Sequence, residues 1–189
     1  MSGWFFNTRD FHAYAYWDDA FSPIECESII KMGLEKELSS GLAMDETVKK
    51  IRHSSVSWIG VSKESDWIYQ RCSEISINLN NRFFGFDLFG MTEDFQFTQY
   101  KSPGERYGKH LDIGRGNIPR KLSLVLQLSD PKDYEGGELV LHLSEEPTVV
   151  PKKQGYITIF PSFVLHEVTP VTSGTRHSLV SWISGKPFV

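Results

Sequence analysis

The stretch KLSLVLQL, residues 121–128, decides the fold class, because its hydrophobic residues recur with a period of two. Successive side chains of a β-strand point to opposite faces, so one face carries only leucines and the other is partly polar. The leucine face predicts a strand packed on a core, and the partly polar face predicts a strand that lines an interior cavity. The leucine face consists of Leu122, Leu124, Leu126 and Leu128, and the partly polar face consists of Ser123, Val125 and Gln127.

Four further segments of the second half alternate in the same way and are separated by turn clusters such as YEGG (134–137) and VTSG (171–174). They are FQFTQY (95–100), GELVLHL (137–143), GYITIFP (155–161) and TRHSLVSWIS (175–184). Segments of this kind, at this spacing, predict many short antiparallel strands.

The first half of the chain predicts two helices and one strand. The first helix begins after Ser22, with Pro23 at its first position, Glu25 placed for a capping box, and apolar residues every four positions behind it. The second helix spans about 66–81, and IRHSSVSWIG (51–60) between them predicts a strand. The sequence therefore predicts an α+β, mostly β fold, in which helices cover the outside of a β-sandwich or barrel.

Length and composition limit the function classes. A chain of 189 residues with 40% hydrophobic and 23% charged residues predicts one folded domain, and a net charge of −4 argues against a nucleic-acid partner. No apolar run reaches the ~18 residues of a membrane span, and no signal peptide is recognisable, so we expect a soluble, cytoplasmic protein with no membrane partner. Cys26 and Cys72 lie on apolar helix stripes, which predicts reduced, buried thiols.

Three residues have the character of metal ligands. His110 and Asp112 are two positions apart in KHLDI, so in an extended segment both side chains point the same way. A lone His-x-Asp pair is also typical of a surface histidine beside a turn-capping aspartate. His166 closes the predicted strand GYITIFPSFVLHEV (155–168) and supplies a third ligand, and two histidines with one carboxylate are the facial triad of non-haem Fe(II) oxygenases. A core histidine bonded to a backbone carbonyl is the alternative for His166.

Arg176 comes ten residues after His166, and the turn between them predicts that its strand returns antiparallel beside the His166 strand. Arginine binds a carboxylate through two parallel hydrogen bonds and keeps its charge, so Arg176 is a candidate carboxylate site, with the Ser178 hydroxyl on the same face. We expect His142 and His177 to be structural.

Four segments together resemble the 2-oxoglutarate and Fe(II)-dependent dioxygenases of the prolyl 4-hydroxylase type, including the bacterial PKHD-type hydroxylases. They are YKSPGERYGKHLD (100–112), RKLSLVLQLSD (120–130), EGGELVL (135–141) and PSFVLHEVTPVTSGTRHSLVSW (161–182). The resemblance implies a double-stranded β-helix of the jelly-roll or cupin-like kind over residues 95–185, with residues 1–94 as a helical support region with strands, in one domain spanning 1–189. It also implies hydroxylation of a second substrate, coupled to oxidative decarboxylation of 2-oxoglutarate to succinate and CO₂.

The resemblance also implies roles for residues. By that likeness His110, Asp112 and His166 are the catalytic iron ligands, and Arg176 pairs with the distal carboxylate of 2-oxoglutarate. The cofactors implied are Fe(II), 2-oxoglutarate and O₂, with L-ascorbate as a reductant. Further contacts to 2-oxoglutarate are expected from Tyr100, Tyr107, Gln127 and Ser178, although several relatives have tyrosine where this chain has Gln127. Contacts to the substrate are expected from Arg120 and Trp182 at the mouth of the cavity.

Three functions remain open from the sequence. The favoured one is a hydroxylase of a prolyl residue in a peptide or protein, or of a related small molecule. A cupin-like isomerase or sensor would need the triad but not Arg176. A nucleic-acid dealkylase on the same fold has a second arginine downstream of the first, and the residues after Arg176 contain none. Substrate choice is expected from the loops at 113–120, 41–50 and 11–19, and no oligomeric state is predicted.

Overall fold

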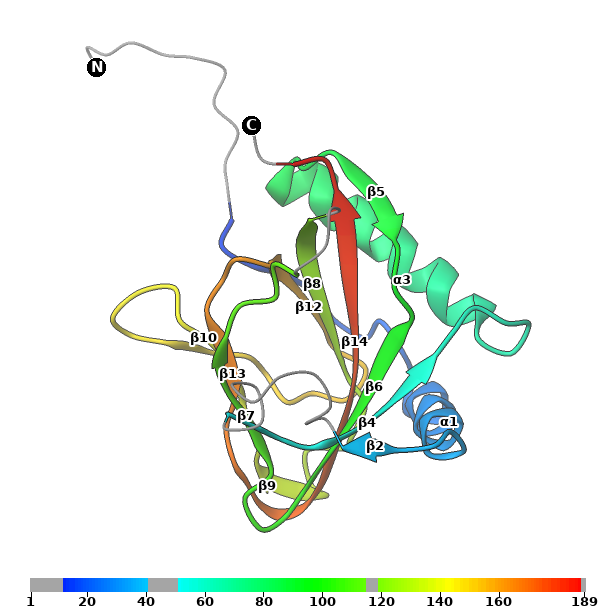
Figure 1. Ribbon diagram of the computed structural model, residues 1–189, viewed down its shortest axis with the longest axis vertical. Helices are drawn as coiled ribbons and strands as arrows, with labels where there is room; N and C mark the ends of the chain where they lie inside the picture. Colours follow the sequence, from blue (N-terminus) through cyan, green and yellow to red (C-terminus); the bar gives the residue numbers. More distant parts are fainter. Residues whose placement is uncertain (1–11, 41–50, 115–118, 188–189) are drawn as a thin grey trace.

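Two antiparallel sheets face each other in the computed structural model, which describes residues 12–40, 51–114 and 119–187 (Figure 1). The larger sheet has the order β1 (Ala15–Trp17), β12 (Ile157–Pro161), β8 (Arg120–Gln127), β14 (Val171–Gly185), β6 (Phe95–Lys101), β4 (Ser55–Ile59) and β2 (Ser39–Ser40). Two further strands, β5 (Leu88–Met91) and β9 (Tyr134–Gly136), also pair with β14. The smaller sheet has the order β11 (Thr148–Val149), β10 (Leu139–Leu141), β13 (His166–Val168), β7 (Arg106–His110) and β3 (Arg52–His53).

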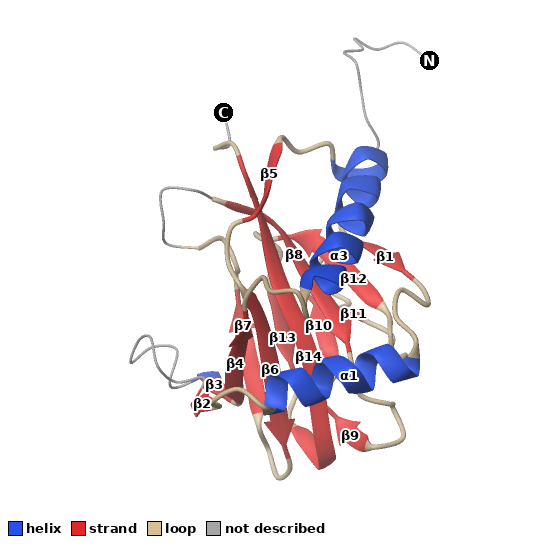
Figure 2. Ribbon diagram, turned by 90° about the vertical axis from the view of Figure 1, so that its right-hand side faces the viewer, coloured by secondary structure: helices blue, strands red, loops and turns tan. Residues whose placement is uncertain are grey.

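Two helices cover the outer face of the larger sheet, as the sequence predicts (Figure 2). In α1 (Pro23–Leu34) the expected capping box is present: the Ser22 backbone N–H donates to Glu25, and the Glu25 N–H donates to the Ser22 hydroxyl. The second helix, α3 (Asp66–Leu79), continues into the π-helical turn η1 (Asn80–Phe84). None of the described helices is long and apolar enough to cross a membrane.

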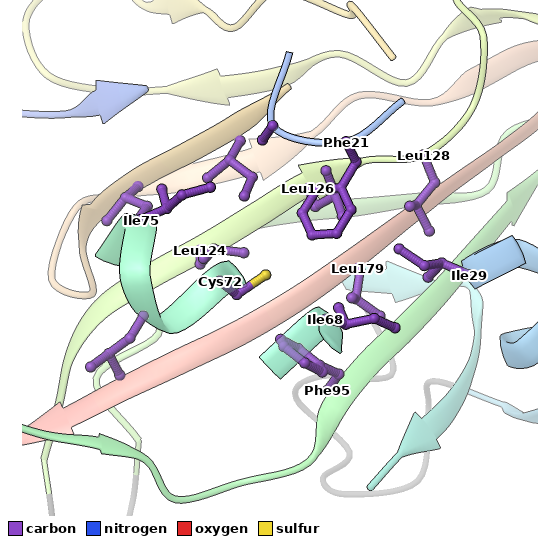
Figure 3. Packing of buried hydrophobic residues seen from close by; sticks show 14 of the residues in the cluster. Phe21, Ile29, Ile68, Cys72, Ile75, Phe95, Leu124, Leu126, Leu128 and Leu179 are labelled. Atoms are coloured by element: carbon purple, nitrogen blue, oxygen red, sulfur yellow. The ribbon is translucent and has the colours of Figure 1, made fainter. Parts of the chain in front are cut away.

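The main hydrophobic core lies between these helices and the larger sheet (Figure 3). All four leucines of the 121–128 stretch are fully buried in it, so the predicted leucine face is confirmed. Cys26 and Cys72 lie in the same core as free thiols, and burial raises the pKa of both to about 12. The helices and the leucine face thus support one side of the larger sheet, which leaves its other side for the space between the sheets.

A smaller apolar cluster fills part of the space between the two sheets. It takes Val125 from the polar face of β8 and Tyr100 from β6, and it includes Leu139 and Val168 from the smaller sheet. The prediction that the polar face of β8 turns towards an interior space is therefore confirmed, since that space lies between the sheets.

Three expectations about strand arrangement are wrong. The strand of Arg176 does not run beside that of His166: β14 pairs with β6 and β8 in the larger sheet, whereas β13 pairs with β7 and β10 in the smaller one. The chain changes sheets in the turn after Pro161, so His166 begins a new strand rather than closing β12. The predicted strand at 51–60 is divided in the same way at Ser54, with β3 in the smaller sheet and β4 in the larger.

The segments expected to choose the substrate are only partly described. Residues 15–17 form β1, which pairs with β12 at the edge of the larger sheet, so this part of the 11–19 segment is a strand and not a loop. Residues 41–50 and 115–118 lie outside the described residues.

Candidate metal centre and adjoining cavity

His110, Asp112 and His166 meet at one end of the space between the sheets. The two histidines are paired residues of neighbouring strands, at the end of β7 and the start of β13, and Asp112 lies two residues beyond β7. Asp112 Oδ1 is 3.6 Å from His110 Nε2, and Asp112 Oδ2 is 3.4 Å from His166 Nε2. One ligand atom from each residue lies within 4.8 Å of the others, a spacing at which all three can reach one ion.

Backbone carbonyls orient both imidazoles. His110 Nδ1 lies 2.8 Å from the Gly108 carbonyl oxygen, and His166 Nδ1 lies 2.9 Å from that of Val164. A carbonyl oxygen only accepts, so each Nδ1 carries a hydrogen, and Nε2 is the nitrogen of each ring that can bind a metal when the ring is neutral.

Serine hydroxyls and a backbone bond hold the carboxylate. Ser123 Oγ donates to Asp112 Oδ2 at 2.8 Å, and Ser162 Oγ lies 3.2 Å from Ser123 Oγ. The Asp112 N–H donates to the Ser162 carbonyl at 2.9 Å. The sequence places Ser123 on the polar face of its strand, but its contact with Asp112 depends on how the two segments meet across the fold.

The three side chains have the charges that a divalent cation needs. Burial acts to raise the pKa of Asp112, but the hydrogen bond and the charge of His166 outweigh it and hold that pKa well below its usual range. Burial and the neighbouring charge of His166 lower the pKa of His110 to about 4. Burial also acts to lower the pKa of His166, but its contacts with Asp112 leave it raised. At neutral pH the site therefore presents an anionic carboxylate and at least one neutral imidazole.

A cavity next to the triad is lined by several of the residues that the sequence analysis singles out. The triad, Tyr100, Tyr107, Arg176, Ser178 and Trp182 all line it, with apolar walls from Val125, Leu139, Val168 and Val180. Arg176 is 2% exposed, its Nη1 donates to Ser178 Oγ at 3.3 Å, and its buried Nε has no hydrogen-bond partner. No carboxylate of the described residues pairs with Arg176. A buried guanidinium of this kind suits a carboxylate brought by a ligand.

The model of the 2OG-Fe(II) oxygenase superfamily matches residues 95–184, which include the triad and Arg176. A PKHD-type hydroxylase of Colwellia psychrerythraea is 30% identical over 166 residues, which cover 86% of this chain and 74% of that protein. The chain belongs to the 2OG-Fe(II) oxygenase superfamily.

Two further comparisons bear on this oxygenase. A PKHD-type hydroxylase of Prochlorococcus marinus is 48% identical over 83 residues, which cover 43% of this chain but only 38% of that relative. A prolyl hydroxylase of Trichoplax adhaerens, solved in complex with a peptide fragment of hypoxia inducible factor, has the same fold with a TM-score of 0.76 and 18% identity. That match covers 92% of this chain and 84% of the other, and it confirms the double-stranded β-helix expected from the sequence.

Gln127 does not line the cavity beside the metal ligands of this oxygenase. Its side chain donates to the Tyr134 hydroxyl at 2.8 Å, and it lines a smaller adjoining space with Arg176. Burial raises the pKa of Tyr134, whose hydroxyl also hydrogen-bonds to Arg176. Tyr134 is thus a candidate site residue that sequence reasoning treats only as part of the YEGG turn, because its strand β9 reaches Arg176 by pairing with β14.

Arg120 is already neutralised in the structure. Its Nε donates to Glu93 Oε1 at 2.6 Å, and its guanidinium lies 3.6 Å from the ring centre of Trp182, which itself lines the cavity. His142 and His177 do not line this cavity, as expected. The His177 ring stacks on Phe97, and its Nδ1 is hydrogen-bonded to the Ser129 hydroxyl. His142 Nε2 lies 2.9 Å from Glu167 Oε1.

Proposed function

We propose that this oxygenase hydroxylates a second substrate while 2-oxoglutarate is decarboxylated to succinate and CO₂. The observation that carries the proposal is the presence, in one cavity, of the His110–Asp112–His166 cluster and of the buried Arg176, which no carboxylate of the described residues neutralises. The donor set fits Fe(II), since two imidazole nitrogens and one carboxylate leave positions open for 2-oxoglutarate and O₂. Bound there, Fe(II) would supply the oxygen activation that the hydroxylation requires.

The chain's own residues would bind and orient the cosubstrate. Arg176 would receive its distal carboxylate, supported by the hydroxyls of Ser178 and Tyr134. Burial raises the pKa of Tyr100 and of Tyr107, so both phenols stay protonated at neutral pH and can donate hydrogen bonds into the cavity. The apolar walls exclude water, which strengthens each of these polar contacts.

For the substrate we propose a prolyl residue in a peptide or protein, or a related small molecule. The names of the relatives support this: they are PKHD-type hydroxylases and a prolyl hydroxylase solved with a peptide. Trp182, with Arg120 stacked on it, provides an aromatic wall on which a pyrrolidine ring can pack.

An anaerobic titration tests the proposed reaction. Purified apo-protein is loaded with Fe(II) and then with 2-oxoglutarate, and the visible charge-transfer band of chelated 2-oxoglutarate is recorded. We expect a band that is absent in His166→Ala and kept in His142→Ala, whose imidazole contacts Glu167 instead of the triad. Iron binding without a band in the wild type would refute the proposal and favour a cupin-like metal protein.

A further inference from the structure

A second buried arginine lies beside the metal cavity. Arg52 is 8% exposed and pairs with Tyr107 across β3 and β7. Its Nε donates to Ser54 Oγ at 2.9 Å, its Nη1 donates to Gln96 Oε1 at 3.3 Å, and its guanidinium lies 4.7 Å from the ring centre of Tyr107. Its buried Nη2 has no hydrogen-bond partner among the residues that the structure describes.

Among the described residues the partners of Arg52 are all neutral, as are those of Arg176, which sets both apart from Arg71 and Arg120. Arg71 pairs with Glu25 and Arg120 with Glu93, whereas no carboxylate of the described residues pairs with Arg52. Burying a charge without a counter-charge is costly, and a buried donor without an acceptor adds to that cost. A ligand with a negative charge would compensate for both.

The position of Arg52 places such a ligand at the cavity. Two of its three contacts, Gln96 and Tyr107, line the cavity, and the Tyr107 ring stacks on that of His110 at 3.5 Å between centroids. Along β6, Tyr100 is the residue paired with Arg176. Gln96 lies four residues from Tyr100 on this strand, which separates their Cα atoms by about 13 Å. Arg52 therefore borders the metal ligands through Tyr107. It is set apart from Arg176 only by position along β6, and the charges of both arginines act on the Tyr100 hydroxyl.

The charges of the loaded site are consistent with a further anion. Fe(II), Arg176 and Arg52 together carry four positive charges, and Asp112 with the two carboxylates of 2-oxoglutarate carries three negative ones. One positive charge is left, and Arg120 does not change the count because Glu93 neutralises it.

We propose that Arg52 binds a carboxylate of the substrate that is hydroxylated. This inference rests on the proposed function and narrows its substrate class to molecules with a free carboxylate on the ring that is hydroxylated, such as a C-terminal prolyl residue or a free cyclic amino acid. An internal prolyl residue offers only neutral amides at that position and would leave the Arg52 charge uncompensated.

Matched acid and amide probes test the inference on protein loaded with Mn(II) and 2-oxoglutarate. The probes are N-acetyl-L-proline against N-acetyl-L-prolinamide, and acetate against acetamide, with dissociation constants from calorimetry. We expect the wild type to bind each acid at least about tenfold more tightly than its amide, because a charge-assisted bond replaces a neutral one. Arg52→Gln should lose this preference, and Arg52→Lys, which retains the charge, should keep part of it.

Two further measurements separate this role from others. The control Arg82→Gln removes an exposed arginine of η1 outside the cavity and should keep the acid preference. The 2-oxoglutarate affinity of Arg52→Gln should match the wild type, because the distal carboxylate of 2-oxoglutarate is assigned to Arg176 and not to Arg52.

The outcomes are distinct. A wild type without acid preference, or an Arg52→Gln protein that retains it, overturns the inference. An Arg52→Gln protein that loses 2-oxoglutarate affinity would also overturn it, by assigning Arg52 to the cosubstrate. Absence of the charge-transfer band in the wild type would instead refute the proposed function.

Discussion

Replacing Ser123 by alanine should weaken metal binding although Ser123 is not itself a metal ligand. Its hydroxyl is fully buried and donates to Asp112 Oδ2 at 2.8 Å, and we find no other hydroxyl of the described residues bonded to this carboxylate. A hydrogen bond to a charged group contributes about 1.5–3 kcal/mol. Loss of a partner that orients a metal ligand typically lowers metal affinity about 10- to 100-fold. We therefore expect the Mn(II) dissociation constant of Ser123→Ala to rise by that factor.

The neighbouring strand offers a matched control. Ser181 is equally buried, and its backbone is paired with Leu124 next to Ser123, but its hydroxyl has no hydrogen-bond partner in the described part of the chain. Ser181→Ala should therefore bind Mn(II) as the wild type does, and its free energy of unfolding should be unchanged or raised. Ser123→Thr, which keeps a hydroxyl, should recover most of the affinity.

Mn(II) affinity is measured by the loss of the free-ion electron paramagnetic resonance signal on titration, and unfolding by urea. Wild-type affinity in Ser123→Ala would refute the reasoning, because Asp112 would then be held equally well without the hydroxyl. An equal loss in Ser181→Ala would also refute it, since the effect would then arise from any buried serine of this sheet.

Three further predictions concern the cosubstrate, acid stability and helix packing. Arg176→Gln should raise the dissociation constant of 2-oxoglutarate about 100-fold, as loss of a buried charge pair does, with Mn(II) affinity unchanged; equal 2-oxoglutarate affinity in a spectroscopic titration would contradict this. Burial, and then the charges of Arg176 and Lys101, lowers the pKa of His177 in the folded protein to about 4. In the unfolded chain this pKa is about 6.5, so between pH 6.5 and pH 4 the unfolded state binds a proton that the folded state does not. Stability should therefore fall between pH 6.5 and 4 by up to about 3 kcal/mol, and His177→Gln should show less of this loss in urea unfolding at pH 7 and pH 5. Gly33→Ala should destabilise the protein by about 1–3 kcal/mol, because a Cβ there would lie 2.3 Å from the Phe97 ring. This overpacking outweighs the gain of about 1 kcal/mol in helix propensity. A higher urea midpoint for the variant would contradict the prediction.

Local signals in the sequence were sufficient for the elements and for the metal-ligand candidates. Alternation in residues 121–128 predicts which side chains of β8 enter the core, because the two faces of a strand follow from backbone geometry alone. The Ser22 and Glu25 capping box is local for the same reason, since both partners lie within one helical turn. His110 and Asp112 are close in sequence, so their convergence could be anticipated from an extended backbone.

Contacts between distant segments were decided by the tertiary structure alone. The turn after Pro161 moves the chain to the other sheet, so His166 and Arg176 lie on strands of different sheets and not on adjacent ones. The approach of Ser123 to Asp112, of Tyr134 to Arg176, and of Arg52 to Gln96 likewise depends on which strands pair. Periodicity determines the face on which a side chain lies, but the partner across a sheet or cavity depends on the packing of the whole chain, which no local pattern encodes.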